Sequence, residues 1–363
     1  MTWRVPAELE DAVRDAARGV VGDAALADGA LARAIVDRSK RYTSERERLA
    51  RPADRTADLA ARAAFFTIAD AIKVAIPLRE LANRGALPAR DPLRVVDVGA
   101  GCGALALGLA ATLDRAFELV AIDRDADALR IASAALRAFA GTRAQVATRV
   151  ADVATAPLPP AELVLVGSVL NELPAAARLP LVERALAQLA PDGALIVIEP
   201  ALRDTTRALH ELRDAVLARR LAHVFAPCTR QLAPCPALAG PDDWCHEDRV
   251  VELPPRAAQL ARVTHLRDSG LKFSYLVLRR APSAMTGWRI VSEPHAQKGK
   301  LELYGCSDAG RVPLRLLGRH RAAGNRDLER AHRGDVVIVD AEPGDERVEI
   351  TAATRVERIE PAR

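Results

Sequence analysis

The sequence predicts an α/β protein in which a doubly wound parallel sheet follows a helical region and precedes a cysteine-rich loop and a small β-domain. Short apolar segments alternate with helical segments between residues 93 and 200, the pattern of a parallel sheet covered on both faces. Closely spaced glycines follow the first apolar segment, and four of the five cysteines follow the last. We therefore divide the chain into residues 1–88, 89–222 and 223–363.

The composition excludes several classes of protein. Half of the 363 residues are hydrophobic, which permits a large core and excludes wholesale disorder. No apolar run approaches the roughly 18 residues that a membrane-spanning helix needs. Acidic residues occupy the place of a signal peptide's apolar stretch, and five cysteines are too few for a disulfide scaffold. We expect a cytoplasmic monomer without a membrane segment.

The charge is unevenly distributed. Lys and Arg total 52 against 48 Asp and Glu, but Arg256 to Arg333 holds 16 basic and 6 acidic residues. A basic block of this kind suits a polyanion such as nucleic acid. Arginine outnumbers lysine 47 to 5 throughout, so a solvated surface in an arginine-rich chain is the alternative.

Residues 1–88 have the apolar spacing of helices. A long helical pattern begins at a capping Asp54 and ends at Gly85. We expect the polar stretch before it, which includes Tyr42, Ser44 and Arg46, to be a solvated helix face, and contact with a partner is the alternative.

The predicted α/β domain alternates in a regular order. Its predicted strands cover residues 93–101, 117–123, 144–152, 162–174 and 193–200. Predicted helices fill three of the intervals, at residues 104–113, 126–141 and 179–191. Ligands of such a sheet bind at the carboxyl ends of its strands.

The turn after the first strand contains Asp97, Gly99, Gly101 and Gly103. Glycines allow a sharp turn and a close approach of backbone to ligand. Gly99, Gly101 and Ala104 also match the dinucleotide-binding fingerprint. Asp97 distinguishes a dinucleotide site from a site for a cofactor that carries an amino acid, because its carboxylate would repel a pyrophosphate and attract an ammonium group.

This segment resembles the first motif of the S-adenosylmethionine-dependent methyltransferases, which have a Rossmann-like fold. The resemblance implies that Asp97 and the glycines hold the methionine end of the cofactor. It further implies that Asp123 accepts the ribose hydroxyls and Asp152 lies at the adenine. At the transfer site it implies Ser168, Asn171 and Glu172, the last two as candidate catalytic residues. An ordinary turn aspartate is the alternative for Asp123 and Asp152.

The methylated atom is not evident. The fourth strand ends in NELP, which differs from the Asn/Asp-Pro-Pro-aromatic motif of adenine-N6 and cytosine-N4 enzymes. No cysteine in that turn offers the nucleophile of a cytosine-C5 mechanism. Methyl transfer needs mainly in-line positioning, so catalytic residues are few, and cofactor binding without transfer is an alternative.

Cys228, Cys235, Cys245 and Cys306 follow the α/β domain, three of them in a loop rich in proline and glycine. Four thiolates suit a zinc ion or an iron–sulfur cluster. The gaps hold 6, 9 and 60 residues, whereas zinc knuckles have tight pairs. Unrelated buried thiols are the alternative. His246 is a substitute ligand, and Cys102 is expected to line the cofactor loop.

The run FAPC…CP…DWCHEDR, with LKFSYLVLRR at 271–280, resembles the methyltransferase-like assembly factors of the mitochondrial small ribosomal subunit and their bacterial relatives. The resemblance covers roughly residues 40 to 340. It implies a [4Fe–4S] cluster on the four cysteines and binding to small-subunit rRNA, with a role in translation. Family members often have Cys-Pro-His after the first thiol, where this chain has Cys228-Thr229-Arg230. The run between the second and third cysteines is also longer than in the family. These departures affect the expected geometry and type of the cluster more than the identity of its ligands.

The last part is predicted as a small β-barrel or meander packed on the α/β domain. Its predicted strands are residues 273–280, 287–293, 300–307, 312–318 and 335–342. A cluster that includes Cys306 would clamp this part to the loop at 228–245.

Basic side chains of the β-part are expected to contact phosphates. They are Arg279, Arg280, Arg289, Arg311, Arg315, Arg319, Arg321, Lys298 and Lys300. Phe273, Tyr275 and Trp288 either stack on bases or, as is commoner for strand aromatics, belong to the core.

Two function hypotheses remain. The first is an S-adenosylmethionine-dependent methyltransferase, containing iron and sulfur, that acts on small-subunit rRNA or an associated protein. The second is a non-catalytic rRNA-binding assembly factor with a vestigial transfer site. A zinc-containing methyltransferase of another substrate is a further alternative, and a small-molecule methyltransferase is the least favoured, since it needs neither four thiolates nor a basic β-part.

Overall fold

The computed structural model describes residues 2–45, 52–268, 270–344 and 346–362. The chain forms two compact units that alternate along the sequence. Unit 1 contains Met1–Ile76, Pro88–Ala190 and Arg249–Lys272, and unit 2 contains Pro77–Leu87, Pro191–Asp248 and Phe273–Arg363. The predicted division into residues 1–88, 89–222 and 223–363 treats each domain as one continuous stretch of chain, and it stays a prediction from the sequence. No helix within the described residues is long and apolar enough to cross a membrane.

Unit 1 contains a parallel sheet with the strand order β4-β3-β2-β5. These strands are β2 (Leu93–Val98), β3 (Phe117–Asp123), β4 (Ala144–Val150) and β5 (Ala161–Gly167). Strand β2 pairs with β3 on one side and with β5 on the other. The strand order therefore reverses at β2, the place where α/β sheets bind ligands.

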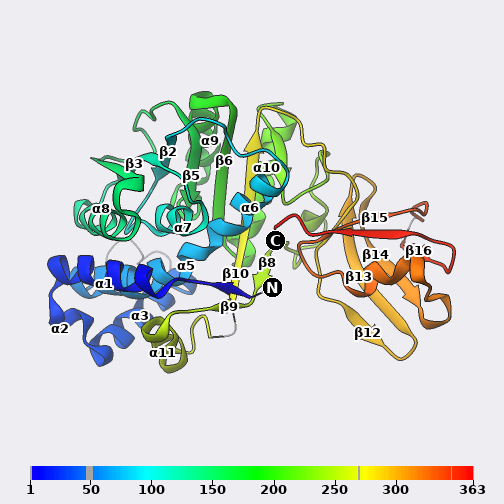
Figure 1. Ribbon diagram of the computed structural model, residues 1–363, viewed down its shortest axis with the longest axis horizontal. Coiled ribbons are helices and arrows are strands. Elements are labelled where there is room, and N and C mark those ends of the chain that lie inside the picture. Colours follow the sequence, from blue (N-terminus) through cyan, green and yellow to red (C-terminus); the bar gives the residue numbers. More distant parts are fainter. Residues whose placement is uncertain (1, 46–51, 269, 345, 363) are drawn as a thin grey trace. The chain divides into compact units, whose positions relative to one another are not determined.

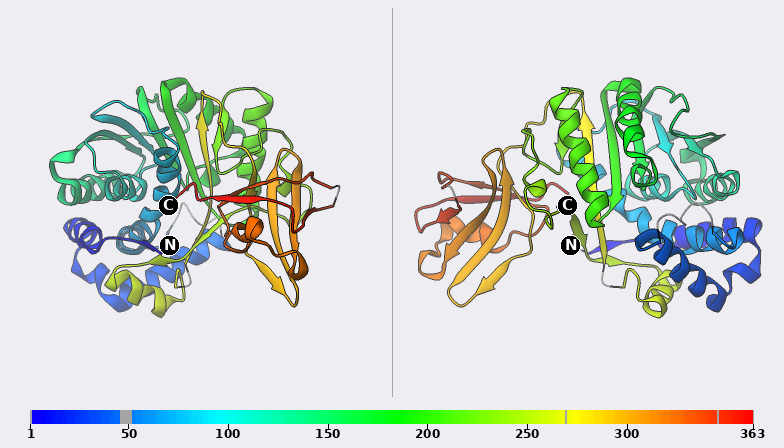
Figure 2. Two further views of the ribbon diagram at one scale, coloured as in Figure 1. Left: turned by 45° about the vertical axis from the view of Figure 1, so that its right-hand side comes forward. Right: turned by 180° about the vertical axis from the view of Figure 1, so that it is seen from behind.

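Helices cover both faces of this sheet. Helices α7 (Ala104–Thr112) and α8 (Ala126–Ala140) lie on one face and α9 (Ala175–Gln188) on the other, as opposite views show (Figures 1 and 2). Helix α8 begins at Asp125, whose side chain accepts a hydrogen bond from the backbone N–H of Ala128. The predicted doubly wound α/β fold is confirmed.

The N-terminal helices of unit 1 pack on α8 through α1. Their bounds are α1 (Ala7–Val21), α2 (Asp23–Leu26), α3 (Asp28–Thr43), α4 (Arg55–Ala61) and α5 (Ile68–Ala71). From later in the chain, α11 (Pro255–Thr264) packs on α3, and β9 (Val251–Glu252) pairs with the N-terminal strand β1 (Trp3–Arg4). Asp54 caps α4 as predicted. The long helix expected after it is interrupted by a π-helical turn, η2 (Arg62–Thr67), and a 3-10 turn, η3 (Ile72–Val74), before α6 (Ala75–Asn83).

In unit 2, strand β10 lies between β6 and β7 and is antiparallel to both. This group contains β6 (Leu189–Pro200), α10 (Arg203–Ala218), β7 (His223–Ala226), β8 (Glu247–Arg249) and β10 (Leu271–Arg279). The assignment of residues 273–280 to the small β-domain was wrong. The strand is apolar along both faces, so it is buried within a sheet that helices cover.

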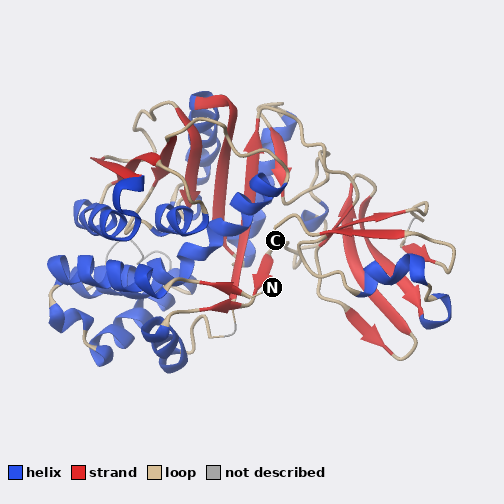
Figure 3. Ribbon diagram, viewed as in Figure 1, coloured by secondary structure: helices blue, strands red, loops and turns tan. Residues whose placement is uncertain are grey.

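The remainder of unit 2 is a separate seven-stranded sheet, drawn in red at the right of Figure 3. Its strands are β11 (Trp288–Ile290), β12 (His295–Gln297), β13 (Lys300–Ser307), β14 (Gly310–Leu317), β15 (Val336–Val339), β16 (Val348–Ile350) and β17 (Val356–Ile359), with a short helix α12 (Arg326–Glu329). The strand order is β16-β14-β13-β11-β15-β17, with β12 beside β13. The order departs from a meander, because β15 returns beside β11 and β16 runs parallel to β14.

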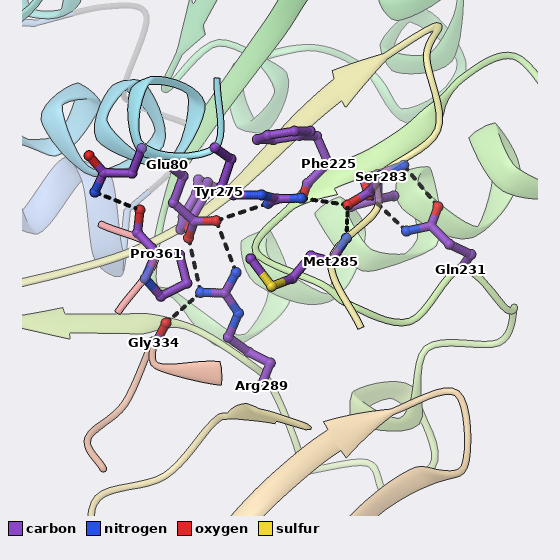
Figure 4. Close-up of polar contacts among 12 residues, drawn as sticks. Glu80, Phe225, Gln231, Tyr275, Ser283, Met285, Arg289, Gly334 and Pro361 are labelled. Carbon is purple, nitrogen blue, oxygen red and sulfur yellow. Dashed lines mark hydrogen bonds and ion pairs between the residues drawn. The ribbon is translucent and has the colours of Figure 1, made fainter. Parts of the chain in front are cut away.

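A buried ion pair connects α6, β10 and β11 within unit 2 (Figure 4). The two carboxylate oxygens of Glu80 accept hydrogen bonds from Arg289 at 2.9 and 3.0 Å. The hydroxyl of Tyr275 donates to the same carboxylate at 2.6 Å. All three side chains are buried, and Arg289 also donates to the carbonyl oxygen of Gly334 while Arg84 donates to Glu80 at 3.4 Å, so the buried polar groups are paired.

Two sequence-based expectations are resolved here. The phosphate-contact prediction for Arg289 was wrong, because a cation in the core must pair with a buried acid. Phe273, Tyr275 and Trp288 are buried, which confirms that they belong to the core.

The variant Glu80→Gln should lower the free energy of unfolding by about 3–5 kcal/mol, because it leaves Arg289 buried without a counter-charge. Glu252→Gln is the matched control. Its partner is Arg4, both side chains are exposed, and the loss should be less than about 1 kcal/mol. Denaturant unfolding followed by circular dichroism measures both. Equal effects would contradict the assignment of Glu80 as the central buried acid.

Candidate cofactor site and cysteine group

The turn between β2 and α7 has a backbone that only glycine adopts easily. Gly99, Gly101 and Gly103 all have positive φ, at 71°, 52° and 87°. A Cβ on Gly99 would lie 2.2 Å from Cγ2 of Val169, which follows β5. The turn therefore passes close to the end of β5 with no room for a side chain.

Asp97 lies in β2 directly before this turn, between the paired strands β3 and β5. Its side chain is buried and accepts a hydrogen bond from the backbone N–H of Ala106 in the first turn of α7. The atom Oδ2 has no partner among the described residues. Burial, with the nearby charge of Asp123, raises the pKa of Asp97 to about 7. The carboxyl group is thus ready to receive a cationic donor.

Asp123 ends β3 and is fixed by two backbone donors. The N–H of Gly101 donates to Oδ2 at 2.8 Å and the N–H of Asp125 donates to Oδ1 at 2.9 Å. Each oxygen keeps a further lone pair for a ligand hydroxyl. Asp123 is therefore attached to the glycine turn itself, as a residue of the same site.

Arg62, which the sequence-based analysis missed, reaches the same turn from η2. Its Nη1 is 2.6 Å from Oδ2 of Asp125, and its Nη2 would be 3.3 Å from a Cβ on Gly101. A π-helical turn is rare and frequent at functional sites. The guanidinium can receive a ligand carboxylate as well as that of Asp125. The available signal was that Arg62 is the one arginine between residues 56 and 78 of an alanine-rich apolar stretch.

Three other predicted residues lie on strand ends of unit 1. Asp152 is exposed, and its Oδ1 accepts from the N–H of Ala154, so it closes a turn of its own. Ser168 has a φ of 57°, a left-handed conformation that a residue with a side chain rarely adopts. Cys102 is buried within the glycine turn, and burial raises its pKa to about 11. The predicted roles of Asp152 and Ser168 remain predictions.

Asn171 and Glu172 meet the N-terminal helices. The amide of Asn171 donates to the hydroxyl oxygen of Tyr42 at 2.9 Å, so Tyr42 contacts a predicted transfer-site residue and does not lie on a solvated helix face. Burial raises the pKa of Glu172, although Arg38 and Arg124 oppose the shift. Arg46, named with Tyr42 and Ser44, lies outside the described residues.

The structure gathers Cys228, Cys235, Cys245 and Cys306 within unit 2, and all four are free thiols. Burial raises the pKa of the Cys306 thiol to about 12, with further increases from Cys228 and Cys235. Burial raises the pKa of Cys245 as well, and there the other three cysteines all add to the shift. The four sulfurs therefore lie within electrostatic reach of one another.

Arg213 of α10 supplies a positive charge to this cysteine group. Its side chain is fully buried, and its Nη2 donates to the carbonyl oxygens of Arg230 and Leu232 at 2.7 and 3.2 Å. Cys228 and Cys235 raise the pKa of Arg213 despite its burial. The arginine therefore both holds the loop and favours thiolate charge beside it.

The loop is attached directly to the strand of the fourth cysteine. Thr229 donates from its hydroxyl to the carbonyl oxygen of Cys306 at 3.1 Å, and Arg230 donates to the carbonyl oxygens of Ser307 and Asp308. The residues that depart from the family's Cys-Pro-His pattern are thus the ones that join loop and strand. Within the part of the chain that the structure describes, no three His, Cys, Asp or Glu side chains are arranged to hold a metal ion.

The reversal of strand order at β2, the glycine turn and the acids at the ends of β2 and β3 define an α/β domain of the S-adenosylmethionine methyltransferase type. A family model described as mitochondrial small ribosomal subunit Rsm22 matches residues 58–337, more than half of the chain. The chain belongs to the Rsm22 family. No curated protein matches it.

Several solved structures are similar to this chain. An S-adenosylmethionine-dependent methyltransferase from Leishmania major is 15% identical, covers 69% of this chain and 82% of its own, and has a TM-score of 0.39. Magnesium protoporphyrin IX methyltransferase from Synechocystis is 13% identical, covers 68% of this chain and 97% of its own, and has a TM-score of 0.39. A putative RNA methyltransferase from Pyrococcus horikoshii is 14% identical, covers 58% of this chain and 84% of its own, and has a TM-score of 0.37.

Asp97 should make stability depend on pH. Its pKa is 3.8 in the unfolded chain and about 7 in the folded protein, so the folded protein binds more protons between these values. The free energy of unfolding should therefore fall as pH rises from about 4 to 7. Asp97→Asn keeps the neutral shape, should remove this part of the slope and should be more stable than the wild type at pH 8. Urea unfolding across the range measures it, and an unchanged slope would contradict the buried-acid assignment.

Proposed function

We propose that this protein binds S-adenosylmethionine at the β2–α7 turn and acts as a methyltransferase on the small ribosomal subunit, with rRNA as the acceptor. The single observation that carries the proposal is the buried Asp97, whose free Oδ2 lies beside a glycine turn. A ligand with an ammonium group supplies the missing donor and the missing counter-charge at once. A pyrophosphate would supply neither.

Different residues of the site would bind different parts of the ligand. Asp97 binds the ammonium group, Arg62 pairs with the carboxylate, and Asp123 accepts the ribose hydroxyls. S-adenosylmethionine, when bound, provides a methyl group on a sulfonium centre. Asn171 and Glu172 then face the acceptor side, where the raised pKa of Glu172 helps it to take up a proton.

A second candidate function is that of a non-catalytic rRNA-binding assembly factor. One observation favours it, because the amide of Asn171 is already engaged by Tyr42 of α3, so the N-terminal helices reach the acceptor side. An assembly factor would use the cofactor, if at all, to order these helices. An Asp97→Asn strain that lacks cofactor binding but assembles normal small subunits would favour this function over catalysis.

Calorimetric titration with S-adenosylmethionine tests the first proposal. Asp97→Asn should weaken binding about tenfold to a hundredfold, since a charge-assisted hydrogen bond is lost. Asp127→Asn is the control, because Asp127 of α8 forms an exposed ion pair with Arg130. This variant should bind as the wild type does. Wild-type affinity should rise between pH 6 and 7.5, because binding the ammonium group requires the Asp97 carboxylate. Equal affinity of both variants would overturn the proposal.

We further propose that Cys228, Cys235, Cys245 and Cys306 hold a [4Fe–4S] cluster. The hydrogen bond from Thr229 to the carbonyl oxygen of Cys306, which brings the residue after Cys228 to the strand of the fourth cysteine, supports it, as does the buried cation of Arg213. Four thiolates are the ligand set of such clusters. The group would act as a structural link between loop 228–245 and β13. One zinc ion on the same thiolates, in a methyltransferase of another substrate, is the alternative.

Purification without oxygen, followed by iron, sulfide and zinc analysis, tests this site. We expect about four irons per chain and a visible absorption band. Cys235→Ser should lose iron and lower the melting temperature, whereas Cys102→Ser, a buried thiol of unit 1, should keep the iron. A content of one zinc per chain would show that the cysteines bind zinc and not a cluster. A protein without metal would show that the cysteines are ordinary core thiols.

The proposed partner is the small ribosomal subunit, contacted through rRNA. The family's name and the basic block from Arg256 to Arg333 support this partner. We also propose that the protein is a cytoplasmic monomer, as its five free thiols suit a reducing compartment. Sedimentation with purified subunits, followed by a salt series, tests the association.

A further inference from the structure

The exposed aromatic rings among the described residues both belong to unit 2. Of the large hydrophobic side chains that are exposed among the described residues, the aromatic ones are Trp244 and Tyr304, 38% and 43% exposed. The other two tryptophans, Trp3 and Trp288, are 5% and 7% exposed. Burying a tryptophan ring contributes a large favourable free energy to folding. An exposed tryptophan therefore indicates a surface that binds a partner.

Both exposed rings belong to the cysteine-bearing segments, and Arg311 connects them. Trp244 precedes Cys245, and Tyr304 lies on β13 two residues before Cys306. The guanidinium of Arg311, on β14, lies 5.4 Å from the ring centroid of Tyr304. The same guanidinium is 3.3 Å from Oδ1 of Asp243, the residue before Trp244. Arg311 therefore lies against the Tyr304 ring and pairs with the residue next to Trp244, whose own ring stacks on His246 with 6.0 Å between the ring centroids.

The charges around the rings suit a polyanion. Asp243 pairs with Arg311, and the neighbouring Asp242 pairs with Arg203 at 2.8 Å, so both acids next to Trp244 are neutralised. Tyr304 and Arg311 belong to the stretch with 16 basic and 6 acidic residues. The Tyr304 ring has a cation beside it and the Trp244 ring has the imidazole of His246, a combination found on surfaces that stack nucleobases and bind phosphates.

We propose that Trp244, Tyr304 and Arg311 form an aromatic platform for unpaired RNA bases. This inference rests on the proposed association with rRNA and assigns a surface to it. The rings stack on bases, whose faces are free only in single strands, and Arg311 contacts a phosphate or a base face. The platform gives affinity with little choice of sequence, because every base has a π face.

Intrinsic fluorescence of the full-length protein tests the platform. Because Trp3 and Trp288 are buried, quenching by a short single-stranded RNA of mixed sequence should come from Trp244. We expect strong quenching by the single strand and little by a duplex of the same sequence. Quenching by neither strand form, with no RNA binding in a filter assay, would overturn both the platform and the rRNA part of the proposed function.

Substitutions separate the platform from general RNA binding. Trp244→Ala and Tyr304→Ala should each weaken binding of the single strand by about tenfold or more, while Trp244→Phe and Tyr304→Phe should restore most of it. Ile338→Ala, 42% exposed on β15 of the same sheet, is the matched control and should change nothing. All these side chains are exposed, so melting temperatures should match the wild type.

Two results would overturn the inference and leave the proposed function standing. One is RNA affinity that both alanine variants keep at the wild-type value. The other is normal affinity for free RNA with weaker binding to purified small subunits, which would assign the rings to a ribosomal protein. Binding of S-adenosylmethionine, measured in the same variants, should be unchanged, because none of the substituted residues belongs to unit 1.

Discussion

Unit 1 depends on the burial of one carboxyl group. Asp97 lies in a strand that pairs on both sides, and α7 begins three glycines later over the same carboxyl. Water cannot reach Oδ2, and no described side chain or backbone group donates to it. The sheet therefore maintains an acid whose charged form is unfavourable until a cation arrives. The proposed binding of a ligand ammonium group and the predicted dependence of stability on pH both rest on that arrangement.

Unit 2 also buries charged groups, and it pairs them with counter-charges from its own residues. Its buried cations, Arg289 and Arg213, each lie beside groups that accept hydrogen bonds or carry negative charge. Arg289 pairs with Glu80, and Arg213 pairs with Asp214 at 2.5 Å while also donating to backbone carbonyls. Both cations therefore have a carboxylate partner within the protein. Arg213 additionally lies near the thiols of the cysteine group, where its charge favours the thiolate form that a metal centre requires of its ligands.

The Cys228-Thr229-Arg230 segment shows how a departure from a family pattern is accommodated. Thr229 and Arg230 bind the backbone of β13 and of the turn after it. Loop and strand thus have protein contacts of their own, in addition to any metal link through Cys306. A cysteine variant should therefore loosen this region without detaching it.

The sequence by itself determined the sheet, the glycine turn and the identity of the acids at the strand ends, because apolar periodicity and glycine spacing are local properties. It also indicated the four cysteines as one group, through their family resemblance. Tertiary structure decided what local pattern cannot express. The antiparallel insertion of β10, the approach of Arg62 and Tyr42 to the site, and the pairing of Arg289 with Glu80 depend on residues far apart in the chain. An arginine reads the same in a sequence whether it faces water or a buried acid, and only packing distinguishes the two.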